Sequence, residues 1–260
     1  MGDGFLYVIL HNYSERFMDS LWVIINRPRQ RINDWKKSHG AACFLGSLLS
    51  RAAFIDFRTS MYWMEKLMKW CHNYVNQAFD LSSNVVAGDL CHGTFYAVCQ
   101  ALIVTFCFRY HEFVKYNELS KIRHWGLGRV INCSLEPLVY IDRLIAFCFA
   151  SISRSLQLVY CHHVIRLVTN DKVPFEPYFP FDSYSLERCI FLITLLSYEF
   201  INSLIRRFSP LADDKIRLKN EIYHFGKKCA IRDNDSESMD FLDDVSRDQE
   251  MFGGISFIFI

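Results

Sequence analysis

Hydrophobic residues recur at three- and four-residue spacings in the first segment of the chain, from Phe5 to Asn26. This spacing places them along one side of an α-helix, so the segment is predicted to be an amphipathic helix. Pro28 ends it, because proline removes a backbone donor and clashes with the preceding turn. Two more helices are expected, over about 32–54 and 58–79. The stretch "GAACFLGSLLSRAAF" in the second is rich in small residues, which would let a neighbouring helix approach closely.

Residues 92–113 read "HGTFYAVCQALIVTFCFRYHEF" and form the most apolar part of a fourth helix, expected to end near Tyr116. On a helical wheel, four polar or charged residues of this helix fall on one narrow stripe, and most of the circumference is apolar. The stripe is formed by Thr94, Thr105, Arg109 and Glu112, with the small Ala101 between them. Such a helix is expected to be packed on several sides by other helices.

The same helix has the length of a membrane span, since residues 90–108 contain no Asp, Glu, Lys or Arg. The window is interrupted by His92, Gly93, Thr94 and Gln100, however, and the remaining apolar run has the length that is typical of a buried core helix. We therefore expect no membrane partner. A membrane-associated helical protein stays a third hypothesis at this stage.

The rest of the chain continues the helical pattern with few breakers. Residues 80–89 collect Ser, Asn, Asp and Gly and are expected to form a loop. Ser134 is the expected N-cap of a segment with Pro137 in its first turn, long enough for two helices. Residues 171–184 hold three prolines and are expected to be an extended connector before another apolar helix, Ser185–Phe208, and a basic helix to about Lys228. The pattern predicts an all-α chain, either a bundle or an α-solenoid.

Charge divides the C-terminal part into two blocks, although the formal net charge of the chain is only +1. Residues 215–232 carry six Lys or Arg against one Glu, and residues 233–250 carry eight acids against Arg247. We expect a helical domain over 1–230 and an acidic, disordered tail over 231–260, because a block of like charge cannot offset its ordering entropy. Within the tail Ser236, Ser238 and Ser246 are phosphorylation candidates, with an unmodified solvated linker as the alternative.

Enzymatic and metal chemistry find little support in the chain. Its ten cysteines lack any C-x-x-C pair, which indicates a reduced intracellular protein. Cys91–His92 and Cys161–His162–His163 are adjacent in sequence, and adjacent helical residues point about 100° apart, so neither group is expected to supply a catalytic nucleophile and base. We expect no catalytic residue, metal site or cofactor, and "GLGRV" at 126–130 lacks the third glycine of a dinucleotide loop.

Charged and aromatic residues mix where the apolar helix ends. Arg109, His111 and Lys115 are our candidates for contact with a partner or with nucleic acid, with an ordinary solvated face as the alternative. Lys215–Lys228 is a second basic stretch of the same kind. Arg109 in particular is predicted to meet a partner or a phosphate, the alternative being a surface ion pair.

Five stretches together resemble the RNA polymerase I-specific transcription initiation factor family, also called TIF-IA. They are "FMDSLW" at 17–22, "FLGSLLSRAAFI" at 44–55, "HGTFYAVCQALIVTFCFR" at 92–109, "SLQLVYCHHVI" at 155–165 and "PYFPFD" at 177–182. The central stretch fits the family pattern at His92, Phe95, Tyr96, Cys99, Gln100, Ala101, Phe106, Phe108 and Arg109. The resemblance is to the C-terminal part of the longer proteins of the family.

This resemblance implies a HEAT-like α-solenoid without enzymatic activity. It implies a factor that binds RNA polymerase I and bridges it to the promoter-bound selectivity or core factor, so that ribosomal RNA gene transcription can start. It also implies a place in the nucleus and nucleolus, proximity to the ribosomal DNA promoter, and control by phosphorylation. The residues alone leave open a generic helical-repeat scaffold unrelated to transcription.

Overall fold

The computed structural model describes residues 2–27, 34–81, 86–161 and 206, and these residues form helices and connecting turns without a β-strand. The helices are α1 (Gly2–Ile25), α2 (Asp34–Arg51), α3 (Phe57–Leu81), α4 (Gly93–Lys115), α5 (Leu119–His124), α6 (Leu127–Ile131), α7 (Pro137–Tyr140) and α8 (Arg143–Ser155). A short 3₁₀ turn, η1 (Leu90–His92), leads into α4. The prediction of an all-α chain is therefore confirmed.

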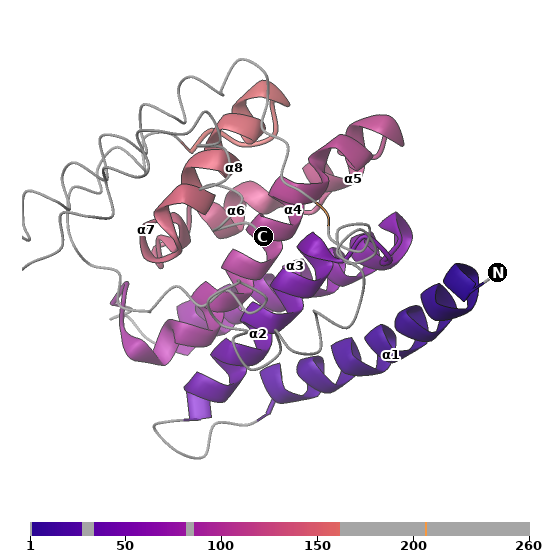
Figure 1. Ribbon diagram of the computed structural model, residues 1–260. Coiled ribbons are helices and arrows are strands. Elements are labelled where there is room, and N and C mark those ends of the chain that lie inside the picture. Colours follow the sequence, from indigo (N-terminus) through magenta and orange to yellow (C-terminus); the bar gives the residue numbers. More distant parts are fainter. Residues whose placement is uncertain (1, 28–33, 82–85, 162–205, 207–260) are drawn as a thin grey trace, which may run out of the picture.

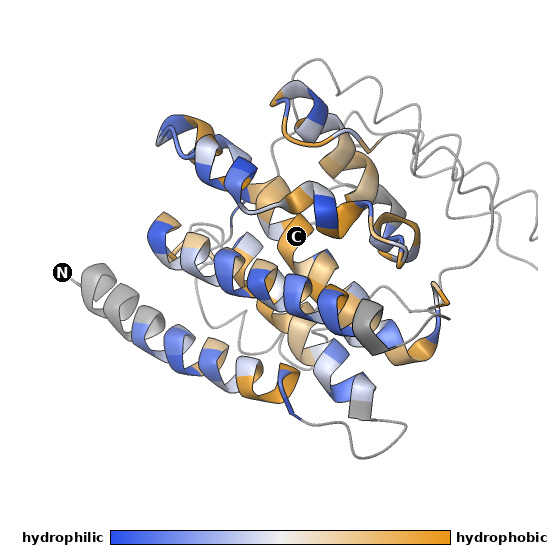
Figure 2. Ribbon diagram, turned by 180° about the vertical axis from the view of Figure 1, so that it is seen from behind, coloured by the Kyte–Doolittle hydropathy of each residue, from blue (hydrophilic) through white to orange (hydrophobic). Residues whose placement is uncertain are grey.

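Helix α4 lies at the centre of the described part, with α2 and α3 on one side and α8 on another (Figure 1). Almost every residue of α4 from Gly93 to Tyr110 is buried. Viewed by hydropathy, α4 is hydrophobic along its length, whereas α1 and α3 turn hydrophilic residues outward (Figure 2). This arrangement confirms the predicted inner helix packed on several sides.

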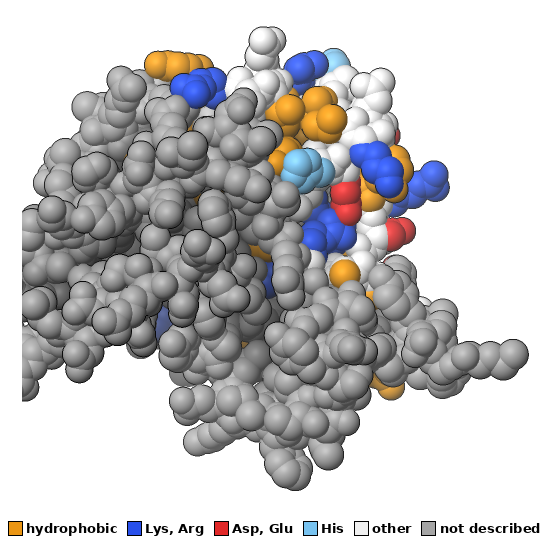
Figure 3. All heavy atoms as spheres, turned by 45° about the horizontal axis from the view of Figure 1, so that its top comes forward, with side chains coloured by type: hydrophobic (Ala, Val, Ile, Leu, Met, Phe, Trp, Pro, Cys, Tyr) orange, Lys and Arg blue, Asp and Glu red, His pale blue; other side chains and the backbone are white. Residues whose placement is uncertain are grey.

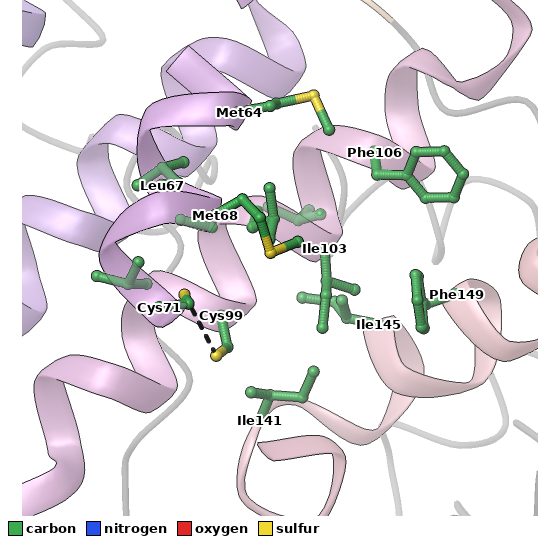
Figure 4. Close-up of a cluster of buried hydrophobic side chains, with 14 of the residues drawn as sticks. Met64, Leu67, Met68, Cys71, Cys99, Ile103, Phe106, Ile141, Ile145 and Phe149 are labelled. Atoms are coloured by element: carbon green, nitrogen blue, oxygen red, sulfur yellow. Dashed lines mark hydrogen bonds between the residues drawn. The ribbon is translucent and has the colours of Figure 1, made fainter. Parts of the chain in front are cut away.

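The core between α3, α4 and α8 is built from aliphatic, sulfur-containing and aromatic side chains (Figure 4). Met68 and Cys71 of α3 face Ile103 and Cys99 of α4, and Phe149 of α8 closes the cluster next to Phe106. The Cys71 and Cys99 sulfur atoms lie 3.8 Å apart, a thiol contact rather than a disulfide. Burial raises the pKa of the Cys99 thiol well above its ordinary value. These cysteines therefore pack as small hydrophobes, as expected from their placement in the sequence.

Small residues set the distance between α2 and α4. A Cβ atom added to Gly46 of α2 would lie 2.6 Å from the Cα atom of Ala101 on α4, closer than real Cβ atoms come. The two backbones therefore meet where the polar stripe of α4 carries its smallest residue. The prediction that the small residues of this stretch of α2 allow close approach is confirmed.

The helix boundaries after α4 differ from the prediction. Pro137 does stand in the first helical turn, but the N-cap of α7 is Glu136 and not Ser134. The cap that uses a side chain comes later, where Asp142 accepts a hydrogen bond of 3.1 Å from the Ile145 N–H at the start of α8. Ser134 was the wrong choice because Glu136 adopts a left-handed conformation (φ 48°) that delays the helix by two residues.

The short helices α5 and α6 were not predicted, because five or six residues give too few turns for a periodic pattern. The proline-rich connector, the two later helices and the acidic tail with Ser236, Ser238 and Ser246 lie outside the described residues.

Candidate interaction site

The three candidate contact residues, Arg109, His111 and Lys115, lie in the last two turns of α4 and point in different directions. Arg109 is 0% exposed, whereas His111 and Lys115 are exposed. Successive helical residues are rotated by about 100°, so His111 lies on nearly the opposite side of the helix from Arg109. The structure thus separates the three residues into an interior group and a surface group.

Arg109 binds the C-terminal end of α2. Its Nε donates a hydrogen bond of 2.6 Å to the carbonyl oxygen of Leu49, and one Nη donates to the carbonyls of Ala52 (3.3 Å) and Ile55 (3.0 Å). The last carbonyls of a helix have no partner within the helix, so they need an external donor. Arg109 supplies that donor and so caps α2 from a neighbouring helix.

Glu112 joins this capping group to a distant part of the chain. One carboxylate oxygen accepts from Arg109 at 3.0 Å, and the other accepts from the Arg206 guanidinium. The Arg206 backbone N–H also donates to the carbonyl of Arg51, at 2.6 Å. Arg206 is thereby placed against the end of α2, and one carboxylate lies between two guanidinium groups.

The environment of Arg109 lowers its pKa from 12.5 to about 10. Burial is the main cause and the Arg206 charge adds to it, while Glu112 and Asp56 act in the opposite direction. A pKa near 10 still leaves Arg109 protonated at neutral pH. The buried guanidinium therefore remains a cation held by three carbonyls and one carboxylate.

This geometry corrects the predicted orientation of Arg109. The sequence placed it on a polar stripe facing a partner or in a surface ion pair, and the structure shows neither. The stripe faces α2, because the close approach at Gly46 brings the carbonyl end of α2 over the last turns of α4. A polar stripe on an apolar helix can thus be satisfied inside the protein when a neighbouring helix ends against it.

Basic and aromatic side chains form the surface at the same end of α4. His111 packs against Tyr110, with ring centroids 3.8 Å apart. The Lys115 amine lies 5.5 Å from the centre of the Tyr116 ring, and that ring stacks on Phe57 at 4.9 Å while remaining 54% exposed. His111 and Lys115 are thus the two candidates that a partner can reach.

The sequence missed the basic residues that follow. Further exposed cations lie on the elements that follow: Lys121, Arg123 and His124 on α5, Arg154 on α8, and Arg129 on α6, which bonds Asn76 of α3 nearer the other end of α4. Figure 3 shows basic and hydrophobic side chains intermingled with few acidic ones over the described part of this face. The run "SKIRH" at 120–124 was the available signal, because three of its five residues are basic. We call Lys115, Lys121, Arg123, His124, Arg129 and Arg154 the basic face.

At its N-terminal end, α4 is hydrogen-bonded to the segment that precedes it, around Gly88. The Tyr96 hydroxyl accepts from the Gly88 N–H at 2.8 Å and donates to the carbonyl of Leu135 at 3.0 Å. The His92 Nδ1 lies 2.8 Å from the Tyr74 hydroxyl, and Tyr74 stacks on Phe95. Gly88 is required here, because its φ is +82° and a Cβ atom would lie 2.4 Å from the Tyr140 ring.

Gln100 adds a further link, since its Oε1 accepts a hydrogen bond of 2.9 Å from the Asp142 N–H ahead of α8. Tyr96 therefore connects α4 to the turn before α7, Gln100 connects it to the start of α8, and Ala101 and Arg109 connect it to α2. The most distinctive sequence of the chain thus encodes the packing of α4 and not an exposed reactive group.

Within the described residues, no group of three His, Cys, Asp or Glu side chains could hold a metal ion. Leu90–Lys115 is long and apolar enough to cross a membrane, yet 78% of its most apolar window is buried among the other helices. A helix so enclosed has the burial of a core helix in a helical stack.

Comparisons with known proteins agree with this architecture. Residues 8–201 match the family described as RNA polymerase I specific transcription initiation factor RRN3. RNA polymerase I-specific transcription initiation factor tif-1A of Caenorhabditis elegans is 39% identical over 251 residues, which cover 94% of this chain and 37% of the relative. Factor RRN3 of Mus musculus is 24% identical over 246 residues, which cover 86% of this chain and 35% of the relative.

The crystal structure of RNA polymerase I transcription initiation factor Rrn3 resembles this chain with a TM-score of 0.56 at 21% identity. The match covers 73% of this chain and 42% of that structure, and it shows that the two share a helical-repeat fold. The chain spans little more than a third of the length of the relatives above. Its assignment to their C-terminal part stays a prediction.

Proposed function

Because the chain belongs to the RNA polymerase I specific transcription initiation factor RRN3 family, we propose that it takes part in starting ribosomal RNA gene transcription without being an enzyme. It binds RNA polymerase I and bridges it to the promoter-bound selectivity or core factor. It acts in the nucleus, at the nucleolus, close to the ribosomal DNA promoter. The single observation that carries this proposal is the family match over residues 8–201. The same match speaks against a scaffold unrelated to transcription.

The structure supports a role in binding and suggests where binding occurs. The residues that distinguish α4 are used to hold the helices together, so a partner meets the surface that this packing presents. His111 and Lys115 lie on that surface beside the exposed Tyr116. Such a mixture of cations and aromatic rings suits contact with a protein segment or a phosphate backbone. Phosphorylation at Ser236, Ser238 or Ser246 would add negative charge to the tail and modulate this contact.

A pulldown from nuclear extract with the immobilised full chain tests the proposal. We expect recovery of RNA polymerase I subunits together with subunits of the promoter factor. The double variant His111→Glu/Lys115→Glu is expected to lower that recovery at least fivefold. The control Arg16→Glu/Lys36→Glu changes exposed residues of α1 and α2 and should recover as much as the unchanged chain. Recovery of neither complex by the unchanged chain would overturn the proposed function.

A further inference from the structure

The basic face is a cluster of cations with few carboxylate partners. Among the described residues, Lys121 has one, Glu118 at 3.1 Å, while Arg123 donates to the backbone carbonyl of Leu156 and Arg129 to the side chain of Asn76. Arg154 is exposed and makes no side-chain hydrogen bond or ion pair to a described residue. The face therefore carries positive charge that its own helices leave largely uncompensated.

Hydrogen bonds fix some of these charges in place. The Arg123 bond to Leu156 ties α5 to the end of α8, and the Arg129 bond ties α6 to α3. Cations held in this way lose less conformational freedom when an anionic segment binds, so less of the interaction free energy is spent on ordering them. The face is thus suited to an acidic segment that contacts several cations at once.

The chain itself contains a segment of matching charge. Residues 233–250 carry eight acids and one arginine, a net charge of −7. The Arg206 contacts with Arg51 and Glu112 place the chain 27 residues before Asp233 at the end of α4 where the basic face begins. Glu112 and Lys115 are one helical turn apart on that end. The predicted basic helix to about Lys228 would be roughly 30 Å long, and a flexible chain of 27 residues also spans about 30 Å on average, so the acids are within reach of the face in either case.

We propose that the acidic segment 233–250 docks on the basic face of the same chain and covers it. Tethering makes the contact intramolecular, and a short tether gives an effective concentration in the millimolar range, so weak ion pairs suffice. Each exposed pair contributes at most about 1 kcal/mol and is screened by salt, which makes the docked state reversible. The covered face is then closed to other anionic partners until the segment is released. The proposal rests on the charges and the Arg206 anchor, and not on the proposed function.

A second basic stretch competes for the same acids. Residues 215–232 precede the acidic segment directly and include Lys215, Lys219, Lys227 and Lys228. Because these lysines differ from Lys115 and Lys121, a chemistry that joins lysine to carboxylate can tell the two sites apart.

Zero-length carbodiimide cross-linking of the full chain tests the docking, because it forms an amide bond only between an amine and a carboxylate in direct contact. An equimolar mixture of ¹⁴N- and ¹⁵N-labelled chains separates contacts within one chain from contacts between two. We expect single-isotope cross-links from Lys115 and Lys121 to Asp or Glu within 233–250. Their yield should fall at least fivefold in 0.5 M NaCl, about three times physiological ionic strength.

Charge reversal supplies the matched comparison. Arg123→Glu/Arg154→Glu leaves both reporter lysines in place and is expected to lower their cross-links to the segment at least fivefold. Arg16→Glu/Lys36→Glu makes the same change in net charge away from the face and should leave the yield unchanged. Cross-links only to Lys215–Lys228, only between differently labelled chains, or with no dependence on salt and on Arg123→Glu/Arg154→Glu would each overturn the docking. Recovery of RNA polymerase I in the pulldown would support the proposed function but would not be evidence for the docking.

Discussion

Gly46 of α2 and Ala101 of α4 touch through their backbones at the point where the two helices pack. A Cβ atom on Gly46 would lie 2.6 Å from the Ala101 Cα and 2.7 Å from its Cβ. No flexible side chain stands there to move aside, so the fit depends on the missing methyl group. From this contact the carbonyl end of α2 extends to Arg109, two turns further along α4.

Replacing Gly46 by alanine is therefore expected to destabilise the protein. Alanine favours a helix over glycine by about 1 kcal/mol, but overpacking a backbone contact costs about 1–3 kcal/mol, so we expect a net loss of up to about 2 kcal/mol. Gly40→Ala in the same helix is the control, because nothing lies within 4 Å of its added Cβ, and it should stabilise by about 0.5–1 kcal/mol. Urea unfolding measures both, and changes of the same sign would contradict the close approach.

Removing the Arg109 side chain should lower the free energy of unfolding more than removing an exposed arginine side chain. Arg109→Ala leaves the buried carbonyls of Leu49 and Ile55 without their donor and Glu112 without one partner. Removing one partner of a buried ion pair of this kind lowers the free energy of unfolding by about 3–5 kcal/mol. The exposed Arg154→Ala serves as control and should change stability by less than about 0.5 kcal/mol. A loss below about 1 kcal/mol for Arg109→Ala in urea unfolding would mean that the guanidinium does not cap α2.

The Tyr96 hydroxyl is expected to hold the loop before α4. Burial raises the pKa of this phenol above its usual range, so it stays protonated and can donate to Leu135 while accepting from Gly88. Tyr96→Phe leaves both backbone groups unpaired, which should cost about 1–3 kcal/mol. Hydrogen exchange followed by mass spectrometry should show faster exchange in the peptide that contains the Gly88 amide.

The control for that experiment is Tyr62→Phe on α3, whose side chain is 58% exposed. It removes the same hydroxyl group without uncovering a buried partner, so it should leave both the exchange near Gly88 and the unfolding midpoint unchanged. Equal exchange rates in Tyr96→Phe and the unchanged chain would contradict the assigned hydrogen bonds.

The stability of the protein is expected to fall as the pH is lowered, because His39 becomes protonated more easily in the unfolded chain than in the folded one. Burial lowers the pKa of His39 below its ordinary 6.5; the ring meets the edge of Trp35 and lies 3.9 Å from the Cys43 sulfur. Between the lowered folded value and about 6.5 the unfolded chain binds more protons than the folded one, so the free energy of unfolding rises with pH in this window. Below the folded value the contribution of His39 to the slope ends.

Urea unfolding midpoints measured across this pH range test the linkage. His39→Gln cannot take up the proton, so its midpoint should depend less on pH than that of the unchanged chain. An unchanged slope in His39→Gln would assign the pH dependence to other groups.

The sequence by itself determined the long helices, because only these have enough turns for their hydrophobic residues to recur at helical spacing. The wheel of residues 92–113 identified α4 as an inner helix, and the small residues of α2 indicated that a neighbouring helix approaches closely. The family resemblance also followed from the sequence, through the order and spacing of five stretches, of which residues 92–109 in α4 are the most specific. The short helices α5 and α6, with the basic residues that they carry, gave no comparable signal.

Only the tertiary structure decided the direction of Arg109. A wheel places a charged residue on a stripe but cannot tell whether the stripe faces water or another helix. The end of α2 decides it, because the Leu49 carbonyl in its last turn and the carbonyls of Ala52 and Ile55 just beyond it lie against Arg109, where the contact of Gly46 with Ala101 brings α2 close. The charge of Arg109, which the sequence assigned to a partner, is therefore a cap within the fold. The exposed candidates are instead His111, Lys115 and the other residues of the basic face.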